Sequence, residues 1–159
     1  MIKTIDCNLL EVDADVIFHC CNVFHTMGAG VALAIKNEYP EAYEADCQTV
    51  KGDKDKLGTV SLAVVKDPTK HKNQNIKAIA NLYGQFGFGK GNRPLSYDAL
   101  YDGLVNLKSR LKPTLKAVAL PYKLGCGLAN GSWPVVEKMI DDIFKDVLYD
   151  VIICKFDNK

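Results

Sequence analysis

The chain has 159 residues, of which 48% are hydrophobic and 25% are charged, and its formal net charge is +1. These values are typical of a globular protein with one core, so we expect residues 1–159 to form a single domain. The small net charge argues against general binding to nucleic acid or to an anionic membrane surface. The apolar runs are all well short of the ~20 residues that a membrane-spanning helix needs.

The cysteines and the N-terminal sequence indicate a reducing compartment. The opening "MIKTIDCNLLEVDADVIF" carries acidic residues where a signal peptide has an uninterrupted apolar segment. We therefore expect a cytoplasmic protein whose six cysteines are free thiols. Cys20 and Cys21 should point to opposite faces of a strand, which argues against a metal site built with His19 and His25. We expect no metal, no cofactor and a monomer.

Strand-like and helix-like segments alternate along the chain. The first half predicts strands at 2–5 and 16–20, helices at 28–39 and 41–50, and a strand at 59–65. The second half predicts a strand at 76–83, a helix at 96–111, a strand at 117–122, a helix at 134–147 and a strand at 151–154. Several strands are apolar throughout, as in strands buried on both faces. This order predicts an α/β fold with a parallel or mixed sheet between two layers of helices.

Two glycine-rich segments each join a predicted strand to a predicted helix. They are "CNVFHTMGAGVALAIK" at 21–36 and "YKLGCGLANGSW" at 122–133. Ligands of such sheets bind beyond the carboxyl ends of the strands, and the N–H groups of a first helical turn attract anions. Neither segment has the lysine of a nucleoside-triphosphate loop or the Rossmann glycine spacing. The pair predicts a diphosphate held by backbone amides; glycines needed only for tight packing are the alternative.

These segments, together with "NLYGQFGFGKGNRPLSYDAL", resemble the macrodomain family. The similarity runs from about residue 5 to residue 154. It is strongest to the branch that contains ADP-ribose-1''-phosphate phosphatases and terminal ADP-ribose protein glycohydrolases. The resemblance implies a three-layer αβα fold with a mixed sheet of roughly six strands and a cleft for ADP-ribose.

The resemblance also implies ligand-binding positions in both loops. The first loop contributes Met27, Gly28, Ala29, Gly30 and Val31, beside the distal ribose and its phosphate. The second contributes Gly125, Cys126, Gly127, Leu128 and Ala129, around the diphosphate. Asn8 matches the position that holds the adenine amino group.

Further matches fall on the walls of the cleft. Gln85 and Phe86 belong to a segment expected to form one wall, where Phe86 or Phe88 would cover the sugar or base, or else pack beneath the loop. His19 and Trp133 are interpreted as packed residues rather than as ligands.

The resemblance implies a hydrolase that removes a group from the distal ribose, with the 1''-phosphate as the preferred candidate. Asn22 would orient a ribose hydroxyl or a water, and His25 would serve as general acid or base. Ala129 stands where glycohydrolases have an acid, and their lysine position falls near Gly84 or Gln85, with Lys90 a few residues further on, so the lysine-dependent route is not supported. The alternatives are a non-catalytic module that binds ADP-ribose or a related signalling nucleotide, and a hydrolase acting on ADP-ribosylated protein.

Overall fold

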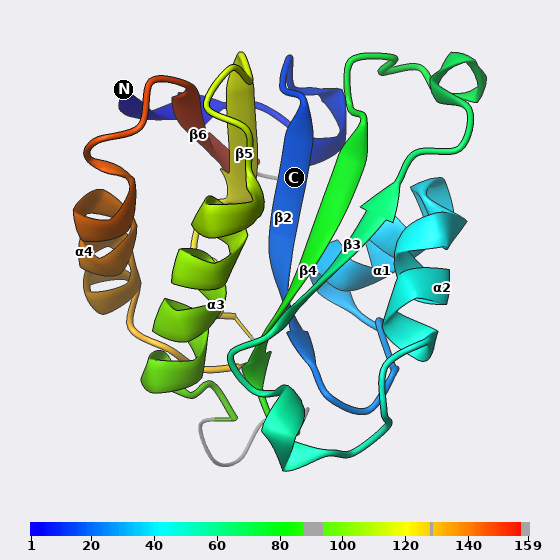
Figure 1. Cartoon of the computed structure of the whole chain (residues 1–159), viewed down its shortest axis with the longest axis vertical. Helices are drawn as coiled ribbons and strands as arrows, with labels where there is room; N and C mark the ends of the chain where they lie inside the picture. Colours follow the sequence, from blue (N-terminus) through cyan, green and yellow to red (C-terminus); the bar gives the residue numbers. More distant parts are fainter. Residues whose placement is uncertain (88–93, 128, 157–159) are drawn as a thin grey trace.

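The computed structural model describes residues 1–87, 94–127 and 129–156, and its centre is a sheet of six strands (Figure 1). The strands are β1 (Ile2–Asp6), β2 (Val16–Asn22), β3 (Val60–Val64), β4 (Ala78–Gln85), β5 (Ala117–Pro121) and β6 (Asp150–Lys155). Their order across the sheet is β1-β6-β5-β2-β4-β3. Only the edge strand β3 is antiparallel to its neighbour, so the predicted mixed sheet is confirmed.

Helices cover both faces of the sheet, as Figure 1 shows. Helices α1 (Gly30–Glu38) and α2 (Pro40–Cys47) pack on one face, and α3 (Tyr97–Arg110) and α4 (Trp133–Phe144) pack on the other. Strand side chains alternate between the two layers: Ile17 packs with α1 and α2, whereas its neighbour Phe18 packs with α3 and α4. The three-layer αβα arrangement predicted from the sequence is confirmed.

The strands are buried for the reason that the sequence indicates. All residues of β5, "AVALP", are buried, and β2 and β4 are buried along most of their length. Parallel strands covered on both faces need apolar side chains on both faces. Within the described ranges every helix is too short or insufficiently apolar to cross a membrane.

Some boundaries differ from the prediction. Strand β4 extends to Gln85 rather than ending at residue 83, and α1 begins at Gly30 rather than at Gly28. Three short 3-10 turns, Leu9–Glu11, Lys54–Lys56 and Pro68–Lys70, were not predicted. In each of these turns an Asn or Asp at the N-cap accepts a backbone hydrogen bond, which is the local pairing that favours such turns.

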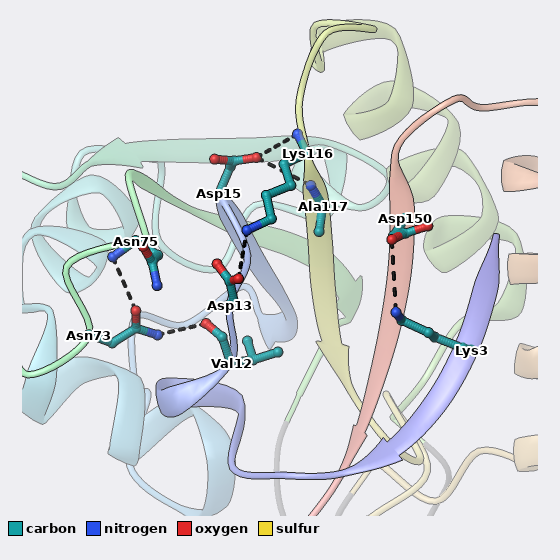
Figure 2. Close-up of polar contacts among 9 residues, drawn as sticks. All are labelled: Lys3, Val12, Asp13, Asp15, Asn73, Asn75, Lys116, Ala117 and Asp150. Carbon is teal, nitrogen blue, oxygen red and sulfur yellow. Dashed lines mark hydrogen bonds and ion pairs between the residues drawn. The ribbon is translucent and has the colours of Figure 1, made fainter.

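Polar side chains join the loops at the amino ends of the central strands (Figure 2). The carboxylate of Asp15 accepts hydrogen bonds from the backbone N–H groups of Lys116, at 2.7 Å, and Ala117, at 3.2 Å. Asn73 donates from Nδ2 to the backbone carbonyl of Val12 at 2.7 Å. The Asp15 contacts join the start of β2 to the start of β5, and the Asn73 contact joins the segment before β4 to the segment before β2. The loops at the carboxyl ends of β2 and β5 are instead the two glycine-rich segments.

Candidate functional site

The carboxyl ends of β2, β4 and β5 lie toward the lower edge of Figure 1. Residues at these strand ends line a cavity of about 680 Å³. Both glycine-rich loops line it. The first contributes residues 26–32, and the second contributes residues 121–125 together with Gly127 and Ala129. The cavity therefore lies where open α/β sheets bind their ligands.

The first loop is held by Asn22, the last residue of β2. Its Oδ1 accepts a hydrogen bond from the N–H of Phe24 at 2.8 Å, and its Nδ2 donates to Oγ1 of Thr26 at 2.6 Å. Met27, which is 3% exposed, has a φ of 38°, in the left-handed region that a non-glycine residue seldom adopts. Asn22 thus lines the cavity and also shapes the loop beside it.

The first loop leads into the N-terminus of α1. The N-cap residue is Ala29, whose side chain has no acceptor for the N–H groups of the first turn, and no acidic residue follows in that turn. Gly30 has a φ of 56°, in the left-handed region that favours glycine. Gly28 differs, because a Cβ added there would meet only ordinary van der Waals contact. The exposed N–H groups and the helix dipole favour an anion at this end of the cavity.

The glycines of the second loop serve two purposes. Gly125 has a φ of 72°, and an added Cβ at Gly131 would overlap the side chain of Leu95 and lie 2.7 Å from the carbonyl oxygen of Gly125. Both therefore have a structural reason to be glycine. Gly127 has none of these reasons, because an added Cβ would meet no atom of the described residues within 4 Å. The backbone of Gly127 is therefore accessible from the cavity that this residue lines.

The floor of the cavity combines polar and sulfur-containing side chains. His19, Cys20 and Cys21 of β2 reach it, together with Asp46 of α2. Burial lowers the pKa of His19 to about 4, so its ring is neutral. Burial likewise raises the pKa of Cys20 to about 12 and the pKa of Cys21 well above its usual value, so both are thiols. Asp46 is the only carboxylate among the described residues that line the cavity.

Four predicted site residues lie outside the described lining of the cavity. Asn8 accepts a hydrogen bond from the N–H of Leu10 and caps a 3-10 turn. His25 lies 3.1 Å from Oγ1 of Thr49 through its Nε2. Phe86 packs edge-on against Phe24 with ring centroids 5.1 Å apart, and Sγ of Cys126 donates to the carbonyl of Leu124.

The other predicted positions divide between two groups. Those that line the cavity are Asn22, Met27, Gly28, Ala29, Gly30, Val31, Gln85, Gly125, Gly127 and Ala129. Leu128, Phe88 and Lys90 lie outside the described residues. His19 is 1% exposed and hydrogen-bonded to Asn81, as expected of a packed histidine, yet it also reaches the cavity. Trp133 packs against Tyr122, with ring centroids 5.1 Å apart.

The sequence interpretation missed three polar lining residues: Thr26, Asp46 and Lys123. Lys123 is exposed, has a φ of 62° and places a cation beside the second loop. Its position directly before "LGCGLA" was a usable signal, because a cation next to an amide cradle assists an anion.

Comparison with known proteins shows the family of the chain. The family model described as "Macro domain" matches residues 18–140. The chain belongs to the macro domain family. An uncharacterized 17.5 kDa protein from the tk-vs intergenic region of Enterobacteria phage T4 is 34% identical over 131 residues, covering 79% of this chain and 77% of that protein.

Solved macro domain structures share the whole fold. The macrodomain of Mycobacterium tuberculosis DarG matches with a TM-score of 0.77 and 23% identity, over 100% of this chain and 99% of that one. Thermosipho africanus DarTG, solved in complex with ADP-ribose, matches with a TM-score of 0.76 and 16% identity, over 99% of this chain and 42% of that one. At these identities the two structures establish the fold of this macro domain.

Proposed function

We propose that this macro domain binds ADP-ribose, with the diphosphate between the two glycine-rich loops. The observation that carries the proposal is the pair Gly28 and Gly127, which come from two loops that line one cavity. Neither glycine is required by close packing, since an added Cβ finds ordinary contact or open space. Open backbone at both positions is what an approaching phosphate needs. The structure of a related fold with ADP-ribose supports the same ligand.

Charge in the cavity is consistent with a diphosphate at the loops. The uncapped N-terminus of α1 and the ammonium of Lys123 both favour negative charge at the loops. Calorimetry tests the proposal with ADP-ribose, ADP and AMP. ADP-ribose should bind more tightly than AMP, because AMP lacks the second phosphate and the distal ribose. Equal affinity for both ligands would contradict the assignment of the first loop.

The finer proposal is hydrolysis of ADP-ribose-1''-phosphate to ADP-ribose and inorganic phosphate. Water attacks the phosphorus, and the loop N–H groups stabilise the negative charge that develops. The open N–H groups of α1 supply that stabilisation without an acidic or basic side chain. Release of phosphate from ADP-ribose-1''-phosphate tests this step, with mono-ADP-ribosylated protein as the second substrate.

A non-catalytic binding module is the second candidate, and the positions of two side chains favour it. Both polar atoms of Asn22 are engaged within the first loop, and His25 is directed to Thr49. Under this alternative, neither substrate is turned over although ADP-ribose binds. For an active enzyme, His25→Ala tests the acid–base role: a loss of about 100-fold or more in turnover would support it, and unchanged turnover would exclude it.

A further inference from the structure

A chain of four hydrogen bonds runs beneath the cavity and has both ends at its floor. Nε2 of His19 lies 2.7 Å from Oδ1 of Asn81, and Nδ2 of Asn81 lies 3.0 Å from Oγ of Ser61. Oγ of Ser61 lies 2.8 Å from the hydroxyl of Tyr83, which donates to Oδ1 of Asp46 at 2.7 Å. His19 and Asp46 line the cavity, whereas the three residues between them do not.

The direction of every donor in this chain is fixed by chemistry. Oδ1 of Asn81 only accepts, so Nε2 of His19 carries the ring proton. The proton of Tyr83 is given to Asp46, so Ser61 donates to Tyr83. All donors therefore point from His19 toward Asp46, and the carboxylate is the terminal acceptor. A chain polarised in one direction strengthens its individual bonds.

Asp46 retains an acceptor that the described residues leave without a donor. The residue is 1% exposed, and its Oδ2 has no hydrogen-bond partner among the residues that the structure describes. The nearby Lys56 attracts the carboxylate, although its Nζ donates to the carbonyl of Val23 at 3.1 Å. A buried carboxylate oxygen without a donor is costly, and in a cavity it indicates a place where a ligand supplies the donor.

We propose that Asp46 binds a hydroxyl group of the terminal sugar of the ligand at the inner end of the cavity. The inference rests on the proposed binding of ADP-ribose and adds the residue that recognises the distal ribose. A sugar hydroxyl would supply the donor that Oδ2 of Asp46 lacks among the described residues. A phosphate brings acceptors and negative charge, so a carboxylate repels it, whereas a sugar hydroxyl donates to it. The diphosphate then remains at the loops.

The test is Asp46→Asn, measured by calorimetry with ADP-ribose and with ADP, which lacks the terminal sugar. The amide keeps the size of the side chain but, with its oxygen facing Tyr83, turns a donor toward the ligand. We expect about 10- to 100-fold weaker binding of ADP-ribose, the range for a hydrogen bond to a charged group, with ADP affinity unchanged. Glu44→Gln is the matched control, because it removes an exposed carboxylate from the same helix.

A ligand-side measurement keeps the test valid if the variant does not fold. Wild-type protein should lose a similar factor of affinity for ADP-ribose that lacks the 2''- or the 3''-hydroxyl. Three results would overturn the inference while the proposed function stands. The first is that Asp46→Asn binds ADP-ribose as tightly as the wild type, and the second is that it loses equal affinity for ADP-ribose and for ADP. The third is that the wild type binds both deoxy analogues as tightly as ADP-ribose. Wild-type protein that binds no ADP-ribose would overturn both.

Discussion

Gly127 and Gly131 lie four residues apart in one loop but are glycines for different reasons. In the part of the chain that the structure describes, an added Cβ at Gly127 would meet no atom within 4 Å, whereas at Gly131 it would overlap Leu95 and approach the carbonyl oxygen of Gly125 to 2.7 Å. One glycine leaves room at the cavity, and the other allows the loop to pack.

Gly127→Ala should therefore impair binding without destabilising the fold. We expect the free energy of unfolding to change by less than about 0.5 kcal/mol, as for a surface substitution, and ADP-ribose affinity to fall about 10-fold or more because the methyl group occupies the approach to the backbone N–H groups. Gly131→Ala is the comparison, with an expected loss of about 1–3 kcal/mol from overpacking. Urea denaturation and calorimetry on both variants measure the two effects. A destabilised Gly127→Ala protein would assign Gly127 to packing.

The buried ring of His19 should make stability depend on pH. Its pKa is lowered from 6.5 to about 4 by burial, so between these values the unfolded chain binds a proton that the folded protein excludes. The stabilisation is complete above pH 6.5 and is lost as the pH falls toward 4, by about 3 kcal/mol in total. His19→Gln keeps a donor for Asn81 but does not titrate, so its urea denaturation curves should lack this component. Identical pH dependence of the two proteins would contradict the assignment.

Asp15 should stabilise the end of the sheet that lies opposite the cavity. Its carboxylate accepts from the N–H groups of Lys116 and Ala117 (Figure 2), and Asp15→Ala leaves both without that acceptor. We expect a loss of about 1–3 kcal/mol in the free energy of unfolding. Asp13→Ala removes an ion pair with Lys116 whose side chains are 61% and 69% exposed, so it should cost at most about 1 kcal/mol. Similar losses for both variants would refute this ranking.

The cysteines should differ in their reaction with iodoacetamide. The thiolate is the reactive form, and burial raises the pKa of Cys20 to about 12 and the pKa of Cys21 well above its usual value. At pH 8 the folded protein should be alkylated at the exposed Cys47 and spared at Cys20 and Cys21. Mass spectrometry of peptides reads the sites, and the urea-unfolded protein, in which all six should react, is the control. Rapid alkylation of Cys20 in the folded protein would show that the cavity floor is more accessible than described.

The fold was predictable because strands buried on both faces carry long apolar runs. The extent of β4 was not, since Gly84 suggests the end of a strand. In the structure Gly84 lies within β4, and an added Cβ would lie 2.8 Å from Sγ of Cys20. A glycine required by close packing against a neighbouring strand looks the same in the sequence as a glycine that ends a strand.

The sequence predicted the parts of the candidate site that backbone conformation determines. It did not predict the parts that depend on the direction in which a side chain points. Both glycine loops line the cavity, but the sequence gives no sign that His25 is directed toward Thr49. Asp46 was missed because acidic residues recur along "EAYEAD", a pattern that is typical of the solvent-exposed face of a helix. Only its spacing of four residues from the buried Ala42 places it on the inner side of α2.

The hydrogen-bond chain that ends at Asp46 constrains how this macro domain can evolve. Its members belong to β2, β3, β4 and α2, and each has its donors and acceptors matched to those of its neighbours. Replacing any one of them by an apolar residue leaves a buried polar group of another without its partner. The polar groups beneath the cavity are therefore difficult to alter by one substitution at a time, whereas Gly28 and Gly127 can be replaced without a packing conflict among the described residues.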